Sequence, residues 1–198
     1  MKRLEDYVMK PQFNEKRATQ IACLLLQRRN GRMNILSLMK LMYLIDRKAL
    51  VKWGWSLTDD DYYSMPRGMV LSKTYNLIHE EPIAEKPIDP TSLSYWKAFI
   101  SAPQDYNVNL IDEPGLNELS QADIDLVNEI YEEFGHLNRF ALVRIHHELP
   151  EWEETKKNSK FVDYEKVLQV SDKSEEEISE IIGEMDVLSQ LEQITIEC

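Results

Sequence analysis

Residues 34–50 read NILSLMKLMYLIDRKAL, and this stretch decides the fold. Its apolar residues return every three or four positions, which is the spacing of one face of an α-helix. They also cover more than one face: one stripe holds Leu38, Leu41, Met42, Ile45 and Ala49, and the other holds Leu36, Met39, Tyr43 and Leu50. A helix that is apolar on most of its surface lies inside a domain. We therefore predict a buried central helix that begins after Asn34 and ends near Gly54.

Further helices are predicted around this one from apolar spacing and from capping residues. The expected start signals are, in chain order, Asn14, Ser120 with Asp123, Asn138, and Ser174 with Glu177. Gly31, Gly135 and Pro150 mark the ends of three of these helices. A shorter helix is expected over residues 70–80, with Pro82 beyond its end.

Three segments between the helices have a different character. Residues 55–68 combine aromatic residues with an acidic turn and a Pro-Arg-Gly turn, which predicts a short hairpin or an ordered loop. Residues 95–100 and 107–111 are two short β-like runs, and they predict a second hairpin. Residues 81–90 contain three prolines and indicate an extended surface connector. The expected fold class is mainly α, of the α+β type: a single-domain helical bundle around a buried central helix, with one or two short β-hairpins.

Composition limits the classes of partner. The 198 residues carry a net charge of -12, which disfavours a general affinity for nucleic acid. The first 50 residues are an exception, because they hold 11 Lys and Arg against 4 Asp and Glu. No signal peptide and no membrane span is expected, so the sequence predicts a cytoplasmic protein without a membrane contact and with Cys23 and Cys198 reduced.

Motifs for catalysis or cofactor binding are missing from the sequence. His147-Glu148 lacks the second His that a zinc-protease helix needs four residues after the first, since that position is Glu151. The run Asp59-Asp60-Asp61 lacks the alternation of a calcium loop, and no glycine-rich phosphate loop is present. We expect no enzyme activity, no cofactor and no metal site.

A more specific pattern covers residues 40–75. It reads KLMYLIDRKAL, then Gly54, then DDYYSMPRGMVLSKTY, and its second half continues to HELPEW at residues 147–152. From about residue 15 to residue 155 the sequence resembles the Panacea domain, also called the SocA-like antitoxin domain. It departs from the family pattern at Met69, where the family usually has Pro, so the turn there either loosens or gains a hydrogen bond.

The resemblance implies a function and a domain organisation. Members are antitoxins that bind a toxin encoded beside them, and one branch acts as a proteolytic adaptor that delivers the toxin to a AAA+ protease. Members also occur in phages and other mobile elements. We expect an N-terminal extension over residues 1–13, a Panacea-like domain over residues 14–155, and an acidic C-terminal helical segment over residues 156–198 that docks on the same domain.

Two groups of residues follow from this resemblance and from the aromatic content. The hypothesis for partner binding is an acidic and aromatic surface made of Trp55, Asp60, Asp61, Tyr62, Tyr63, Met65 and Arg67. The motif residues expected to serve mainly the fold are Lys40, Tyr43, Asp46, Gly68, Tyr75, His147, Pro150 and Trp152.

The alternative function is a nucleic-acid-binding regulator. The two N-terminal helices and the hairpin after them would act as a winged-helix unit, with these basic residues on phosphate: Arg28, Arg29, Arg32, Arg47 and Lys48. An enzyme with a pocket assembled from distant segments is the third reading. The sequence predicts neither the toxin nor the oligomeric state.

Overall fold

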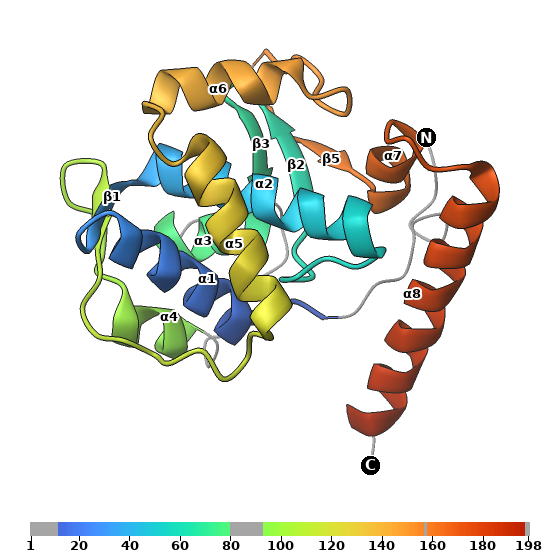
Figure 1. Ribbon diagram of the computed structural model, residues 1–198, viewed down its shortest axis with the longest axis horizontal. Coiled ribbons are helices and arrows are strands. Elements are labelled where there is room, and N and C mark those ends of the chain that lie inside the picture. The colour runs from blue at the N-terminus through green and yellow to red at the C-terminus, as the bar shows by residue number, and fades with distance from the viewer. Residues whose placement is uncertain (1–11, 80–92, 157, 197–198) are drawn as a thin grey trace.

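The computed structural model describes residues 12–79, 93–156 and 158–196 (Figure 1). These parts of the chain form eight helices and five strands. In chain order they are α1 (Glu15–Arg28), β1 (Arg32–Asn34), α2 (Ile35–Trp53), β2 (Tyr62–Met65), β3 (Gly68–Leu71), α3 (Ser72–His79), α4 (Leu93–Phe99), β4 (Asn107–Asn109), α5 (Gln121–Phe134), α6 (Arg139–Glu148), β5 (Lys160–Val162), α7 (Tyr164–Gln169) and α8 (Glu175–Ile196). The predicted class, mainly α with some β, is confirmed.

Helix α2 is the centre of the molecule, as the apolar pattern predicts. Helices α1, α5, α6 and α7 and strands β1 and β3 all pack against it. Leu38, Leu41 and Ile45 have no exposed surface, and each buried side chain of this size stabilises the fold by about 1.5–3 kcal/mol. The side chain of Asn34 accepts a hydrogen bond from Leu36 N, and Gly54 ends the helix in the left-handed conformation, with a φ of 83°. This central helix carries the first part of the family-like motif, residues 40–50.

Strands β3, β2 and β5 form an antiparallel sheet, and β1 pairs separately with β4. The β2–β3 hairpin pairs Met65 with Gly68, so that Pro66 and Arg67 make the connection. Gly68 has a φ of 94°, a conformation that favours glycine. The sheet has a third strand because Val162 of β5 lies opposite Tyr62. The predicted hairpin therefore exists, but it spans residues 62–71 and supplies two strands of a three-stranded sheet, with β2 in the centre.

Two sequence predictions are wrong. Residues 70 and 71 belong to β3, so the helix predicted from residue 70 begins at Ser72. The second hairpin is wrong in its first strand, because residues 95–99 lie in α4. The two runs still meet in an isolated antiparallel bridge between Ile100 and Leu110, while β4 pairs with β1, where Val108 lies opposite Met33. Trp96 explains the first part of this error, since its ring is buried and its backbone N–H donates to the Glu15 carboxylate over 3.0 Å. Contacts with α1 override the local β tendency of these aromatic residues.

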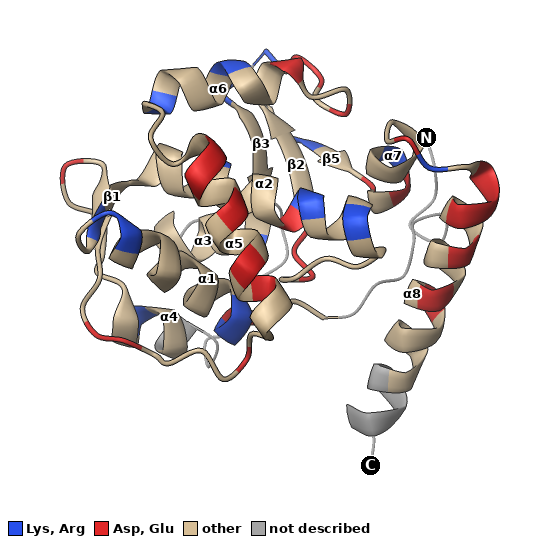
Figure 2. Ribbon diagram, viewed as in Figure 1, with Lys and Arg blue, Asp and Glu red and all other residues tan. Residues whose placement is uncertain are grey.

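The C-terminal segment continues the packed body and then leaves it. Helix α7 packs on α2 and α8 packs on α7. Ser174 and Glu177 form the reciprocal capping box that the sequence predicts for α8. Along α8, Ile178 and Met185 are buried, while the helix extends beside the main body with acidic residues on it (Figure 2). The predicted connector over residues 81–90, most of the predicted N-terminal extension and Cys198 lie outside the described residues, and the domain boundary at residue 155 stays a prediction.

Candidate functional site

A buried carboxylate joins α2 to the loop that follows it. Asp46 accepts hydrogen bonds from Ser56 Oγ at 2.7 Å, from the backbone N–H groups of Leu57 at 3.0 Å and Thr58 at 2.9 Å, and from Tyr62 Oη at 2.8 Å. Asp46 is fully buried, so these four donors replace the water that the carboxylate loses. The arrangement fixes the acidic loop and β2 onto the central helix.

A second buried carboxylate holds the start of α3. Asp60 accepts hydrogen bonds from the backbone N–H groups of Lys73 and Thr74, each at 2.8 Å, and from Thr74 Oγ1 at 2.8 Å. It thus caps a helix whose residues begin 12 positions later in the chain, because the N–H groups of the first helical turn have no partner within the helix. The carbonyl of Asp60 also accepts from Tyr164 Oη at 2.7 Å, which connects α7 to the same loop.

The third buried carboxylate is Glu151, just after α6. Its Oε1 accepts from Arg47 Nε at 2.6 Å and from Tyr43 Oη at 2.8 Å, and its Oε2 accepts from Arg47 Nη2 at 3.1 Å. This is a two-pronged guanidinium–carboxylate pair, the strongest geometry for such a contact. Burial, followed by the Glu151 charge, raises the pKa of Tyr43 well above its usual value, so Tyr43 remains a donor. The segment after α6 is thereby tied to α2.

A buried cation lies beneath the hairpin. Lys40 of α2 has no exposed surface, and its Nζ donates to the carbonyl of Met69 at 2.7 Å. Burial lowers the pKa of Lys40 to about 7. His146 of α6 lies next to it, with Nε2 3.1 Å from the Lys40 carbonyl. A Cβ on Gly68 would lie 2.5 Å from Cβ of His146, so this close packing requires glycine. Met69, which departs from the family pattern, supplies the acceptor for Lys40.

The end of α6 clamps the tip of the hairpin. The His147 and Trp152 rings stack with centroids 4.1 Å apart. His147 Nε2 lies 3.1 Å from the Pro66 carbonyl, and Trp152 Nε1 donates to the Met65 carbonyl at 3.0 Å. Both ring nitrogens therefore hold the turn that Pro66 and Arg67 make. Pro150 lies between the two rings in sequence, in the turn that follows α6.

A pocket of about 710 Å³ lies beside this clamped turn. The starts of α2 and α6, the hairpin, α3 and the end of the loop before β4 surround it. Its lining residues are Asn34, Ile35, Leu36, Met39, Lys40, Met65, Pro66, Arg67, Gly68, Val70, Tyr75, His79, Tyr106, Arg139, Phe140 and Val143. A volume of this size is in the range of sites that bind a side-chain cluster or a small molecule. It is the candidate functional site.

The family of the chain follows from comparison with known proteins. The family model described as Antitoxin SocA-like, Panacea domain matches residues 38–153, which is more than half of the chain. The chain belongs to this antitoxin family. Comparison with curated proteins gave no match, and comparison with solved structures gave none either. The matched range of the Panacea domain contains the three fully buried carboxylates Asp46, Asp60 and Glu151 and most of the pocket.

The structure separates the partner-binding residues that the sequence predicts for this Panacea domain. Met65 and Arg67 line the pocket together with the motif residues Lys40, Gly68 and Tyr75. The remaining members of the predicted surface lie elsewhere: Trp55, Asp60, Asp61, Tyr62 and Tyr63. They therefore do not line the pocket with Met65 and Arg67.

Partner contact by Asp60 and Tyr62 stays a prediction, and in this structure neither side chain reaches the surface. Both are fully buried, because Asp60 caps α3 and Tyr62 donates to Asp46. Tyr63 packs edge-to-face on Phe161, and Asp61 lies 3.5 Å from Lys73 Nζ. No observation tests partner contact by these two residues.

Trp55 lies at the far end of α2. Its ring is 51% exposed and stacks with Trp53, at a centroid distance of 6.0 Å. The nearby Gly54 approaches Ile181 of α8. Trp55 therefore belongs to the surface near α8, away from the pocket, and its contact with a partner stays a prediction.

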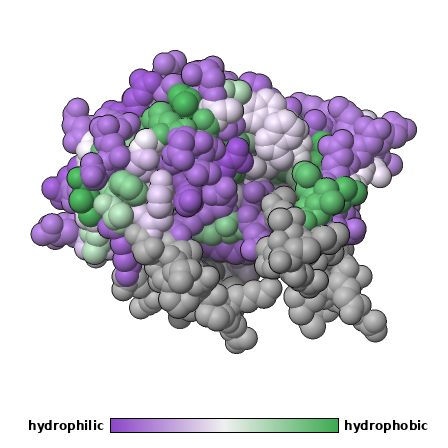
Figure 3. Space-filling view, turned by 90° about the horizontal axis from the view of Figure 1, so that it is seen from below, coloured by the Kyte–Doolittle hydropathy of each residue, from purple (hydrophilic) through white to green (hydrophobic). Residues whose placement is uncertain are grey.

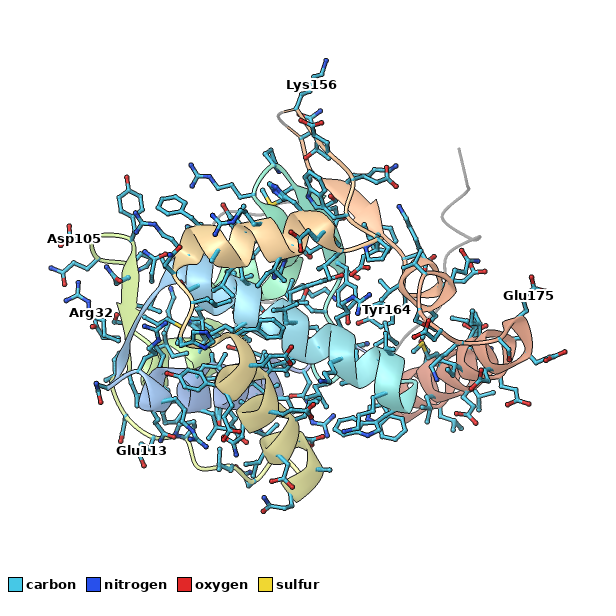
Figure 4. The ribbon with its side chains drawn as sticks, turned by 45° about the horizontal axis from the view of Figure 1, so that its top comes forward. Arg32, Asp105, Glu113, Lys156, Tyr164 and Glu175 are labelled. Carbon is cyan, nitrogen blue, oxygen red and sulfur yellow. The ribbon has the colours of Figure 1, made fainter. Side chains whose placement is uncertain are left out.

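The basic residues of the nucleic-acid alternative make contacts within the Panacea domain itself. Arg28 donates to the Asn128 side chain and Arg29 to the Gly135 carbonyl. Arg47 pairs with Glu151, and Lys48 pairs with Glu129 at 2.6 Å. Arg32 lies at the β1–β4 end of the molecule, on the same side as Asp105 (Figure 4). Four of the five cations are thus held by partners in their own chain, which counts against a phosphate-binding face.

Among the helices of the described residues, none combines the length and the apolar composition that crossing a membrane requires. Within the same residues, His, Cys, Asp and Glu form no group of three or more that could hold a metal ion.

Sequence reasoning missed most of the pocket lining, including three residues at its rim: Tyr106, Arg139 and Phe140. The signal for Arg139 is present in the sequence. Asn138 caps α6, so Arg139 occupies the first helical position, where a cation is disfavoured by the helix dipole. Phe140 follows it and is 61% exposed, although it is a large apolar residue. Tyr106 gives no such signal, because only the pairing of β4 with β1 places it near the start of α2.

Proposed function

We propose that the protein is the antitoxin of a toxin–antitoxin pair and that it neutralises, by direct binding, a toxin encoded by a neighbouring gene. The observation that carries the proposal is the match of residues 38–153 to the SocA-like antitoxin family. A binding role also suits the stability of the site: buried hydrogen-bond networks hold the hairpin and α6 in place around the pocket. A rigid surface binds with less loss of conformational entropy than a mobile one.

The exposed aromatic residues support binding to another protein. Tyr106 is 81% exposed and Phe140 is 61% exposed, and both border the pocket. Aromatic anchors of this kind supply much of the binding energy in protein interfaces. By contrast, the face of the molecule in Figure 3 is mainly hydrophilic, with separate apolar patches. The pocket side is therefore the preferred toxin-facing surface.

The test is co-expression of this chain with the product of its immediate neighbouring gene. The neighbour alone should stop growth, and the pair should restore growth and co-purify as a complex. An empty vector and a folded but unrelated acidic protein are the controls. A harmless neighbour, or a toxic one that neither associates with the chain nor is neutralised by it, contradicts the proposal.

The route of neutralisation is tested separately with purified proteins. If occlusion is sufficient, the antitoxin inhibits the toxin at equimolar concentration without any protease. If the protein is a proteolytic adaptor, inhibition requires a AAA+ protease and ATP, and the toxin disappears during the reaction. We propose occlusion in the cytoplasm as the primary route, because the rigid pocket suits a stable complex.

A further inference from the structure

The pocket has a charge opposite to that of the whole protein. Arg67 of the hairpin turn and Arg139 of α6 are exposed, and Lys40 lies beneath the pocket surface. Among the lining residues that the structure describes, none is Asp or Glu. The chain as a whole has a net charge of -12. A concentration of cations in such an acidic protein favours an anionic group at this one place.

Lys40 gives a second reason to expect an anionic group in the pocket. Its ammonium group has three N–H donors, and in the described structure one of them reaches an acceptor, the Met69 carbonyl. No carboxylate of the described residues pairs with it. Buried charges are normally paired, because moving a charge out of water costs free energy that only a partner charge or hydrogen bonds can offset. A carboxylate brought to the pocket would supply the missing counter-charge.

The helix ends around the pocket act in the same direction. The pocket includes the first residues of both α2 and α6, and the positive ends of helix dipoles attract anions. The side chain of Asn34 already caps Leu36 N, and the side chain of Asn138 caps the N–H groups of Phe140 and Ala141. These backbone donors are therefore not open to a phosphate cradle, and the arginine side chains remain as the direct ligands.

The rest of the pocket is apolar and aromatic. Leu36, Met39, Val70 and Val143 line it, and the rings of Tyr106 and Phe140 border it. The Arg139 guanidinium lies 4.9 Å from the centre of the Phe140 ring. A guanidinium beside an exposed ring suits a ligand that carries a carboxylate next to an apolar or aromatic side chain.

We infer that the pocket is the docking site for an acidic segment of the toxin, in which an Asp or Glu pairs with Arg67 and Arg139 and a neighbouring apolar or aromatic side chain enters between Tyr106 and Phe140. This inference rests on the proposed antitoxin function. A protein segment fits better than a nucleotide, because the lining is largely apolar and the helix N–H groups are already capped.

The first experiment measures the affinity of the purified neighbouring-gene product for three single variants. Arg67→Ala and Arg139→Ala should each weaken binding about tenfold and reduce its salt dependence, as expected for charges at an interface. Arg144→Ala is the matched control, because Arg144 is an exposed arginine of the same helix that does not line the pocket, and it should stay within about twofold. Wild-type affinity in both pocket variants overturns the inference.

A second experiment identifies the toxin segment. A photo-crosslinking benzoylphenylalanine in place of Tyr106 should crosslink a toxin peptide that contains Asp or Glu, while the same group in place of Val187 on α8 should not capture that peptide. Replacing the acidic residue of the peptide by its amide should weaken binding about tenfold, and the loss should not add to that of Arg139→Ala. A captured peptide without an acidic residue overturns the inference.

Lys40 provides a readout that a purely structural role would not give. Burial lowers the pKa of Lys40 to about 7, so at pH 8 most Lys40 side chains of the free protein are uncharged. A bound carboxylate should raise this pKa and cause Lys40 to take up a proton. Calorimetry in buffers of different ionisation enthalpy should show proton uptake at pH 8 that disappears in Lys40→Met. The other titratable residues nearby are His79, His146, Tyr75, Arg67 and Arg139. Uptake that persists in a folded Lys40→Met variant, or is absent in the wild type, contradicts the role of Lys40.

The outcomes separate the two proposals. If the wild type binds the toxin and the pocket variants bind equally well, the pocket inference fails while the antitoxin function stands. If the wild type does not bind the toxin, both fail. Light scattering on the same samples tests whether a second copy of this chain occupies the pocket instead. If Arg67→Ala and Arg139→Ala abolish self-association and leave toxin binding unchanged, the inference is overturned.

Discussion

Two regions of this Panacea domain, the three fully buried carboxylates and the rim of the pocket, carry polar side chains in opposite settings. Asp46, Asp60 and Glu151 have no exposed surface and accept several hydrogen bonds each. Arg67 and Arg139 are exposed, and the surface around them contains large exposed rings. The first region holds the chain in one conformation, while the second offers charge and apolar surface to something outside it.

The difference separates a region that holds the fold together from the region that we propose binds the partner. Asp46 belongs to the motif by which the sequence resembles the family, and it accepts four hydrogen bonds from groups within the chain. Arg139 and Phe140 lie outside that motif and face the solvent. Part of the pocket rim, including Arg139 and Phe140, thus lies outside the family-like motif, while Arg67 lies within it.

The strongest test of this division is Asp46→Ala. The variant removes an acceptor from four buried donors, of which the Thr58 N–H keeps a second acceptor in Ser56 Oγ, and each donor left unsatisfied costs roughly 1–3 kcal/mol. We expect the free energy of unfolding to fall by about 4 kcal/mol or more, measured by urea denaturation. Asp125→Ala, on the exposed face of α5, should change it by less than about 0.5 kcal/mol. Similar values for the two variants would remove the distinction between network and surface.

Glu151→Gln comes next. It keeps the shape of the side chain but leaves the Arg47 guanidinium without its charge partner, for a loss of about 3 kcal/mol. Thermal unfolding and urea denaturation should agree on this loss. Glu154→Gln, an exposed change three residues later, is the control. A neutral effect of Glu151→Gln would show that the contact between α6 and α2 does not depend on the ion pair.

His146 makes the stability of the network sensitive to acid. Burial, followed by the charge of Lys40, lowers the pKa of His146 well below 6.5, so the folded state excludes a proton that the unfolded state binds below that pH. Stability should therefore fall as pH decreases below about 6.5, by roughly 1.4 kcal/mol per pH unit from this residue. Urea denaturation at pH 7.5 and pH 5.5 should show a smaller pH effect in His146→Gln. An equal effect in both proteins would assign the acid sensitivity to other groups.

The smallest effect on stability is expected at the rim. Phe140→Ala removes an exposed ring, so the free energy of unfolding should change by less than about 0.5 kcal/mol. Toxin affinity should nevertheless fall about tenfold, because the ring is placed as an interface anchor. Urea denaturation and a binding titration on one preparation give both values. A large stability loss with unchanged affinity would assign Phe140 to the scaffold.

The sequence predicts the elements whose signals are local. The apolar stripes of residues 34–50, the Asn caps at residues 14, 34 and 138, and the capping boxes at Ser120 and Ser174 all describe contacts within a few positions, and the structure confirms them. Each of these signals needs only the 3.6-residue repeat and a side-chain oxygen near free N–H groups.

The sequence does not predict pairings between distant segments. Strand β5 has three residues and pairs with β2 across about half the length of the chain, while α4 depends on the contact of Trp96 with Glu15. The pocket is a product of such pairings, since Tyr106 reaches it only through β4. The sequence likewise does not predict that Asp60 and Tyr62 are buried. An acidic and aromatic run has the same sequence pattern whether its side chains face solvent or a buried hydrogen-bond network.

The position of β5 has a consequence for synthesis of the protein. Val162 of β5 lies opposite Tyr62 of β2. The ribosome therefore adds β5, the second pairing partner of β2, about 100 residues after β2 itself. At usual elongation rates this interval lasts about 5–20 seconds, during which β2 presents unpaired backbone groups along one edge. A nascent antitoxin is thus exposed to mispairing before its last strand arrives, and shortening the chain before residue 160 would make that transient state permanent.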